Sequence, residues 1–194
     1  MATFQTGILL LILALWITEP GVEGCSCAQA HLQQHFCYSD IVIRAKVIGE
    51  QTVFPTDSLH GEEMIEYKIK LIKMFKGFDK VDNLTYVYTS VHESLCGVRL
   101  DAKNKVQYLL SGSLFNQGKV EVELCGIVEP WDELPLAQRK NLHRYQKGCE
   151  CEISSCYEHH CRATKNKCVW HPYSEQTVFG VCTKHANGSC GWIM

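Results

Sequence analysis

Cys25, Ser26 and Cys27 form the stretch with the clearest capacity for chemistry, provided that processing leaves Cys25 as the first residue. A free Cys25 would present its α-amino nitrogen and its own carbonyl oxygen, two donors that can chelate one metal ion. The α-amino group has a reference pKa of about 7.7 to 8.0, so a metal displaces its proton easily near neutral pH. We therefore predict that an exposed Cys25 is a zinc chelator.

Residues 1–24 have the pattern of a secretory signal peptide. An apolar run of 11 residues, 7–17, is too short for a permanent membrane anchor. Two helix breakers and two small residues at the minus-three and minus-one positions follow it, namely Pro20, Gly21, Val22 and Gly24. We predict cleavage before Cys25 and secretion into the extracellular space or matrix.

The composition of the processed chain is close to neutral. Removal of the signal leaves 194 − 24 = 170 residues, with 19 Lys and Arg against 21 − 2 = 19 Asp and Glu, because Glu19 and Glu23 are lost. Phosphate binding needs a clear excess of Lys and Arg, so nucleic acid is not expected as a partner. No second apolar stretch of the sequence approaches membrane-spanning length.

All twelve cysteines lie after the predicted cleavage site: 25, 27, 37, 96, 125, 149, 151, 156, 161, 168, 182 and 190. An even count in an exported chain predicts six disulfides and no free thiol, although their spacing alone leaves the pairing open. The sequons at Asn83 and Asn187 fit the same compartment and are predicted glycosylation sites.

The cysteine spacing also predicts two parts. Residues 25–149 carry six widely spaced cysteines and are long enough for a hydrophobic core, whereas residues 151–194 carry six close together. A segment of that second size needs covalent staples to fold. The predicted domains are therefore the signal peptide 1–24, a domain 25–149 and a disulfide-rich subdomain 151–194.

Strands dominate the first part. A short helix is predicted at 30–37 and a second from near Pro135 to Gly148, while apolar alternation predicts strands at 41–47, 66–75, 84–89, 106–111 and 119–124. In the first strand Val42 is expected on the wetter face, and in the last Leu124 is expected inward with Val120 and Val122. In the second strand the inward positions change parity from Leu71 to Ile72 and Met74, which indicates a bulge. Residues 49–63 are expected at the exposed tip of a hairpin that touches a partner. We predict a mainly β fold, a five-stranded barrel of the oligonucleotide/oligosaccharide-binding type with flanking helices.

Each of the remaining motifs has both a structural explanation and a possible function. A structural zinc site competes with disulfides for the cysteines, but the spacing lacks paired Cys-x-x-Cys knuckles. The cluster 158–161 (Glu-His-His-Cys) is most simply a solvated surface, and hydrolase and nucleotide-binding motifs are missing, so an enzyme is not expected. A basic run is either a solvated strand edge or a site for sulphated matrix polysaccharide: Lys68, Lys70, Lys73, Lys76 and Lys80.

A resemblance to a known family rests on several short motifs together with the twelve cysteine spacings. They are Cys25-Ser26-Cys27, His31, Gln33, Phe36-Cys37, residues 40–46 and 73–77, Glu93-Ser94-Leu95-Cys96-Gly97, and Pro130-Trp131. From Cys25 to about Trp192 the chain resembles the tissue inhibitors of metalloproteinases. The resemblance implies a netrin-like barrel, a small C-terminal subdomain and the disulfides Cys25–Cys96, Cys27–Cys125, Cys37–Cys149, Cys151–Cys190, Cys156–Cys161 and Cys168–Cys182.

The resemblance also implies how such a chain acts. The amine and carbonyl of Cys25 would bind the zinc of one matrix metalloproteinase in a 1:1 complex, so the protein has no cofactor of its own and the zinc belongs to the target. Contacts to the metalloproteinase are expected from Cys25, Ser26, Cys27, Ala28, Ser94, Leu95 and Cys96. The haemopexin-like domain of a gelatinase is a further expected partner of the C-terminal subdomain. The alternative is a netrin-like module that binds matrix or a receptor without inhibiting a protease.

Overall fold

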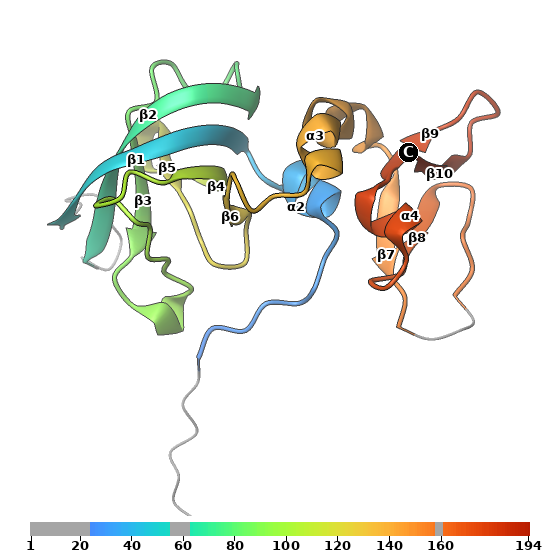
Figure 1. Cartoon of the computed structure of the whole chain (residues 1–194), viewed down its shortest axis with the longest axis horizontal. Coiled ribbons are helices and arrows are strands. Elements are labelled where there is room, and N and C mark those ends of the chain that lie inside the picture. The colour runs from blue at the N-terminus through green and yellow to red at the C-terminus, as the bar shows by residue number, and fades with distance from the viewer. Residues whose placement is uncertain (1–23, 55–62, 158–160) are drawn as a thin grey trace, which may run out of the picture.

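The computed structural model describes residues 24–54, 63–157 and 161–194. A β-barrel lies on one side, two helices lie next to it, and a smaller C-terminal part lies beyond the helices (Figure 1). The predicted signal peptide falls outside the described residues except for Gly24. Among the helices that are described, none combines the length and hydropathy needed to cross a membrane.

The barrel is one sheet whose strands are β1 (Ile41–Val53), β2 (Met64–Lys76), β3 (Tyr86–Ser90), β4 (Gln107–Phe115), β5 (Lys119–Glu121) and β6 (Val128–Pro130). The strand order is β1-β2-β3-β5-β4-β6, and an additional pairing of β1 with β4 closes the first five strands into a ring. All pairings are antiparallel except β3 with β5, which meet at Tyr88 and Glu121. The predicted mainly β fold with a five-stranded barrel is confirmed.

The strand β1 is buried on both faces near its start. Ile43, Ala45 and Val47 point into the barrel core, while Val42 belongs to a second core that lies under the helices. The sequence pattern placed Val42 on the wetter face, and this was wrong because helices cover that face of the sheet. Alternation within one strand carries no information about what packs on its far side.

The predicted bulge is present in β2. Ala45 pairs with Leu71 and Arg44 with Lys73, so Ile72 is the extra residue on its strand. Leu71 and Met74 pack against the barrel core, but the side chain of Ile72 is 43 % exposed and was wrongly expected to point inward. The extra residue shifts the inward positions by one and lets the strand bend around the barrel.

Several strand ends differ from the sequence pattern. β1 extends to Val53 and pairs there with Met64, so the strands of the hairpin are longer than predicted, and its tip at 55–62 lies outside the described residues. β5 is only three residues long, and Leu124 is exposed instead of inward. β6 was not predicted because three residues are too few to show alternation.

Two helices pack on the outside of the barrel. α2 (Leu32–Tyr38) and α3 (Leu136–Gly148) cover β1 and β4, with Phe36, Leu142 and Tyr145 in the core beneath them. Both helices were predicted to within a few residues. α3 ends at Gly148, where a Cβ atom would lie 2.1 Å from the carbonyl oxygen of Cys182, so only glycine allows this close approach.

The C-terminal part consists of short elements. They are β7 (Glu152–Ser155), β8 (Lys167–Trp170), α4 (Glu175–Phe179), β9 (Val181–Lys184) and β10 (Cys190–Ile193). β7 and β8 pair in parallel, and β9 and β10 pair antiparallel. Three disulfides link these elements, namely Cys151–Cys190, Cys156–Cys161 and Cys168–Cys182.

Side-chain amides from the helices bind the backbone of the C-terminal part. Gln33 is fully buried; its Nε2 donates to the carbonyl of Cys182 at 2.7 Å, and its Oε1 accepts from the Cys182 N–H at 2.9 Å. Gln34 donates to the carbonyl of Ile153 at 2.9 Å, and Asn141 to that of Phe179 at 2.8 Å. These directional bonds fix how the C-terminal part sits on the helices.

Replacing Gln33 with alanine should lower the free energy of unfolding by about 2–4 kcal/mol, because a buried N–H and a buried carbonyl of Cys182 lose their partner. The measurement is guanidinium unfolding with the disulfides intact. Gln51→Ala is the matched control, since Gln51 is exposed on β1 and, within the described part of the chain, its side chain bonds to the side chain of Glu66 and to no backbone group. Equal unfolding free energies for the two variants would contradict the structural role of Gln33.

Candidate functional site

Two disulfides bring together segments that are far apart in the sequence. Cys25 is bonded to Cys96 and Cys27 to Cys125, with Cα–Cα distances of 5.1 and 5.2 Å. The bonds lie against each other, since Sγ of Cys125 is 3.7 Å from Sγ of Cys25 and 3.8 Å from Sγ of Cys96. Residues 25–28 and 94–96 therefore form one surface feature, which we call the ridge.

The first ridge segment has neither helix nor strand. Ser26, Cys27 and Ala28 are exposed, Cys25 is half-buried, and the preceding Gly24 is exposed. The two disulfides hold this segment at one end, and α2 holds the chain that follows. Covalent bonds thus take the place of backbone pairing in keeping an exposed segment in one position.

The second ridge segment is a tight turn after β3. The 3₁₀ helix η1 (Glu93–Leu95) ends at Cys96, whose backbone is left-handed with φ 59°. The N–H groups of Leu95 and Gly97 both donate to the carbonyl of His92 at 3.1 Å. At Gly97 a Cβ atom would lie 2.1 Å from the carbonyl oxygen of Ser90, so glycine is required there. The turn leaves Ser94 and Leu95 exposed on the ridge.

A third segment joins the ridge and was missed by the sequence analysis. The backbone N–H of Leu124 donates to the carbonyl of Cys96 at 2.8 Å, and the Leu124 side chain is 49 % exposed. The pattern Val120, Val122, Leu124 suggested continued burial, but the chain leaves the sheet between β5 and β6. Only the covalent link from Cys125 to the ridge could have indicated that Leu124 lies there.

Three sulfur atoms at the ridge lie close enough to suggest a metal site. Sγ of Cys25, Cys27 and Cys125 are all within 4.8 Å of one another. Cysteine binds metal as a thiolate, however, and all twelve cysteines are in disulfides. The donors that the ridge offers to a metal are therefore backbone and hydroxyl groups instead of sulfur.

The remaining disulfide is Cys37–Cys149, which joins the end of α2 to the residue that follows α3. With it, the six bonds of the structure join the same pairs that the family resemblance implies. All twelve cysteines lie among the described residues, and no free thiol is left.

His31 fixes the helix that carries the ridge segment. Its Nδ1 accepts the N–H of Gln33 at 3.1 Å, so Nε2 carries the proton and donates to the carbonyl of Val178 at 3.1 Å. The side chain is 2 % exposed and packs edge-on against Tyr145, Trp170 and Trp192. Burial lowers the pKa of His31 to about 4, so the ring is neutral at physiological pH.

The basic run divides into two groups. Lys68, Lys70 and Lys73 are exposed on β2. Lys76 instead donates to the carbonyls of Phe36 and Cys37 at the end of α2, at 3.0 and 2.6 Å, and Lys80 forms an ion pair with Asp40. Only the first group is available to a ligand.

The other predicted sites have no part in the ridge. Asn83 and Asn187 are both exposed, and their glycosylation stays a prediction. Oδ1 of Asn187 accepts the N–H of Ser189 at 2.9 Å within its turn. Residues 158–160 of the histidine-containing cluster lie outside the described residues.

Comparisons with known proteins agree on one family. The family model for tissue inhibitor of metalloproteinase matches residues 23–192. Metalloproteinase inhibitor 4 of Mus musculus is 44 % identical over 195 residues, covering 95 % of this chain and 87 % of the relative. Metalloproteinase inhibitor 3 of Scyliorhinus torazame is 43 % identical (98 % and 90 % covered), and metalloproteinase inhibitor 2 of Homo sapiens 38 % (98 % and 90 % covered).

Acid should weaken the fold through His31. Its folded pKa, about 4, lies below the ordinary histidine pKa of 6.5, so the unfolded chain binds more protons between these two values. Stability should fall as the pH drops from 6.5 towards 4, by up to roughly 3 kcal/mol from this one group. Denaturant unfolding at pH 7, 6, 5 and 4 measures it.

His31→Asn should flatten this part of the pH dependence, since asparagine accepts the N–H of Gln33 as an N-cap but does not titrate. His143→Asn is the control, because His143 is exposed on α3. The same slope in wild type and His31→Asn would show that another group causes the acid sensitivity.

Proposed function

Since the chain belongs to the tissue inhibitor of metalloproteinase family and is a metalloproteinase inhibitor, not an enzyme, we propose that it acts through the zinc ion of its target. The proposed ligands are the free α-amino nitrogen and the carbonyl oxygen of Cys25. The other reading of the sequence, a netrin-like module without protease inhibition, is not retained.

The observation that supports this mechanism is that Gly24 and residues 26–28 are exposed, and Cys25 is half-buried, beside two adjacent disulfides. The peptide bond between Gly24 and Cys25 lies where both neighbours are accessible, so cleavage there would leave the new amine at the surface. The disulfide from Cys25 to Cys96 holds that amine next to η1. Secretion of the cleaved chain into the extracellular space or matrix belongs to the same proposal.

The chemistry follows from what a catalytic zinc needs. Such a zinc keeps one coordination position for water, and metal binding lowers the pKa of that water so that it can act as the nucleophile. Two backbone donors from Cys25 would occupy the position of the water and leave the protease without a nucleophile. The ridge offers Ser26, Ala28, Ser94 and Leu95 as the side chains that contact the surrounding cleft.

Because residues 25–28 are held rigidly, a small contact area would be enough for tight binding to the protease. A flexible peptide loses conformational entropy when it docks, whereas a segment already fixed loses little. Residues 25–28 are fixed by two disulfides, and Leu95 and Leu124 add exposed apolar surface beside them. A 1:1 complex follows, because each chain has one such end.

Blocking the amine tests the mechanism directly. Acetylation of Cys25, or one alanine added before it, should raise the inhibition constant at least 100-fold, because the nitrogen loses its lone pair or its position. The measurement is inhibition of an active matrix metalloproteinase, with the processed chain as reference.

The control for that experiment is the fold. The midpoint of thermal unfolding and the six disulfides should be unchanged by the added group, because Gly24 and Ser26, on either side of Cys25, are exposed. A blocked chain that inhibits as well as the processed chain would rule out chelation by Cys25.

The C-terminal subdomain would supply a second contact, with the haemopexin-like domain of a gelatinase. The surface of the C-terminal subdomain supports this contact, because Tyr157 and Tyr173 are 62 % and 95 % exposed there. Aromatic side chains of this kind are enriched where proteins bind one another.

A sulphated matrix polysaccharide is a further proposed partner, supported by like-charged residues that are paired across β1 and β2. Lys46 pairs with Lys70, and Lys68 and Lys73 lie on the same strand as Lys70. Arg44 pairs with Lys73, but its guanidinium donates to Gln107 and lies over the Trp131 ring. Like charges directly opposite in a sheet are destabilising, and a bound polyanion would relieve the repulsion.

Replacing Lys68, Lys70 and Lys73 with glutamine should lower the salt concentration at which the protein elutes from a heparin column. The slope of log affinity against log salt should fall by about three, one for each lost cation. The matched control replaces three exposed lysines elsewhere, Lys140, Lys147 and Lys165. Equal elution of both triple variants would mean that net charge alone, and not this strand, controls binding.

A further inference from the structure

Two loops carry the cysteines that hold the ridge, and both lie at the same end of the barrel (Figure 1). The first follows β3 and contains Cys96, and the second follows β5 and contains Cys125. Because both loops leave the sheet, their backbone N–H groups need other acceptors where the chain becomes buried again. In each loop a buried hydroxyl supplies that acceptor, two residues after the cysteine.

Thr89 provides the hydroxyl for the loop of Cys96. It lies in β3, it is fully buried, and its Oγ1 accepts the N–H of Val98 at 3.0 Å. Val98 is itself buried, whereas the chain between the two residues runs out to the ridge and back. The hydrogen bond therefore closes the base of this loop at the level of the barrel core.

Ser111 has the same role for the loop of Cys125. It lies in β4, it is 2 % exposed, and its Oγ accepts the N–H of Ile127 at 2.8 Å. The N–H of Ser111 donates in turn to the carbonyl of Ile127 at 2.9 Å. A Cβ atom at Gly126 would lie 2.9 Å from Oγ of Ser111, so the backbone of the loop packs directly on this hydroxyl.

The two loops are joined to each other before they reach the ridge. The N–H of Leu124, in the second loop, donates to the carbonyl of Cys96, in the first, at 2.8 Å. Sγ of Cys125 then lies 3.7 Å from Sγ of Cys25 and 3.8 Å from Sγ of Cys96. A displacement of either loop would therefore move the other loop and the disulfide that holds Cys25.

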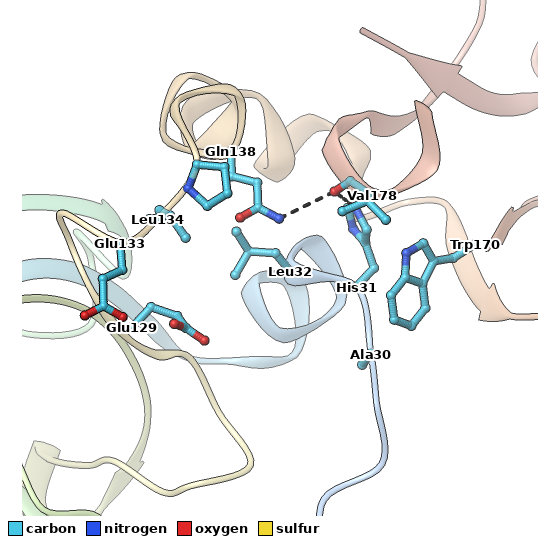
Figure 2. Close-up of a pocket in the computed structure, with 10 residues that line it drawn as sticks. Ala30, His31, Leu32, Glu129, Glu133, Leu134, Gln138, Trp170 and Val178 are labelled. Carbon is cyan, nitrogen blue, oxygen red and sulfur yellow. Dashed lines mark hydrogen bonds between the residues drawn. The ribbon is translucent and has the colours of Figure 1, made fainter. Parts of the chain in front are cut away.

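The first ridge segment is attached at its other end to the C-terminal part. Figure 2 shows Ala30 and His31, which follow this segment, with the ring of His31 bonded to the carbonyl of Val178 at 3.1 Å. The pocket drawn there lies beside this attachment and is lined by none of the ridge residues. His31 fixes where the segment ends, so the position of Cys25 at its start depends on the two loops.

We propose that the hydroxyls of Thr89 and Ser111 are positioning groups for the ridge and thereby set the strength of metalloproteinase inhibition. They hold the two loops in one position, and the disulfides of Cys96 and Cys125 transmit that position to Cys25. Both side chains are buried, so neither contacts the protease. The effect on inhibition rests on the proposed function, because it requires Cys25 to meet the zinc of the target in one orientation.

The alternative is that these hydroxyls contribute only to stability, since a buried N–H that loses its acceptor destabilises any protein. The chain offers a matched control for this alternative. Thr177 is 7 % exposed, and its Oγ1 accepts the N–H of His171 at 3.1 Å in the C-terminal part, outside both ridge loops. Thr177→Val therefore removes the same kind of hydrogen bond without touching a ridge loop.

The first experiment compares variants of the full processed chain as inhibitors of an active matrix metalloproteinase. Thr89→Val and Ser111→Ala should each raise the inhibition constant about tenfold. Thr89→Ser, which keeps the acceptor, and Thr177→Val should both inhibit like the wild type. If Thr89→Val and Ser111→Ala raise the inhibition constant no more than Thr177→Val does, the hydroxyls are only structural and the proposal is wrong.

The second experiment measures the loops without a protease. The rate of amide hydrogen exchange at Leu124, whose N–H joins the two loops, is compared with the rate at Val47, whose N–H donates to Val106 within the barrel. This ratio separates local opening of the loops from unfolding of the whole barrel. It should rise about tenfold in Thr89→Val and Ser111→Ala and stay constant in Thr177→Val. An unchanged ratio in both ridge variants would overturn the proposal.

The two experiments also distinguish this proposal from the proposed function on which it rests. A higher exchange ratio with unchanged inhibition would support positioning of the ridge and would contradict the ridge as the inhibitory surface. Thermal unfolding checks that each variant is folded. Ser111→Ala repeats both measurements on the second loop, so the proposal is still tested if Thr89→Val does not fold.

Discussion

The ridge depends on two disulfide bonds whose sulfur atoms lie in contact with each other. Residues 25–28 make no strand or helix, so backbone pairing cannot hold them, and Ser26 and Ala28 have little surface to bury. The bonds from Cys25 and Cys27 to two loops of the barrel replace both kinds of stabilisation. An exposed segment that would otherwise sample many conformations is therefore presented in one, which is the condition for tight binding through a small area.

Polar groups, more than apolar ones, set the geometry between the barrel and the C-terminal part. Gln33 bonds both the N–H and the carbonyl of Cys182, much as a neighbouring strand would, and His31 bonds the carbonyl of Val178. Apolar contacts tolerate sliding, whereas buried hydrogen bonds are lost when the partners move by an ångström. The chain therefore enters α2 from the ridge, and side chains at the start of α2 bind the C-terminal part.

The sequence was informative where a residue's surroundings lie within its own element. Apolar alternation predicted the five strands β1 to β5, the parity change at Leu71 predicted the bulge, and Pro135 and Gly148 marked the second helix. It failed where a distant element decides: Val42 is buried by helices, Leu124 is exposed because its chain leaves the sheet for the ridge, and Gln33 is buried because a backbone 149 residues away satisfies it. The ridge residues came from family motifs, since spacing alone left the disulfide pairing open.

The weakest junction in the barrel ring lies between β3 and β5, and we call it the seam. These strands share one parallel pairing, at Tyr88 and Glu121, and one further hydrogen bond, from the N–H of Val122 to the carbonyl of Tyr88. The loops that follow these two strands carry Cys96 and Cys125, and each is bonded to the segment that begins at Cys25. The segment that starts at Cys25 therefore links the ends of β3 and β5 covalently across the seam. Under reducing conditions both bonds would open, so the seam and the ridge would lose their covalent support in the same event.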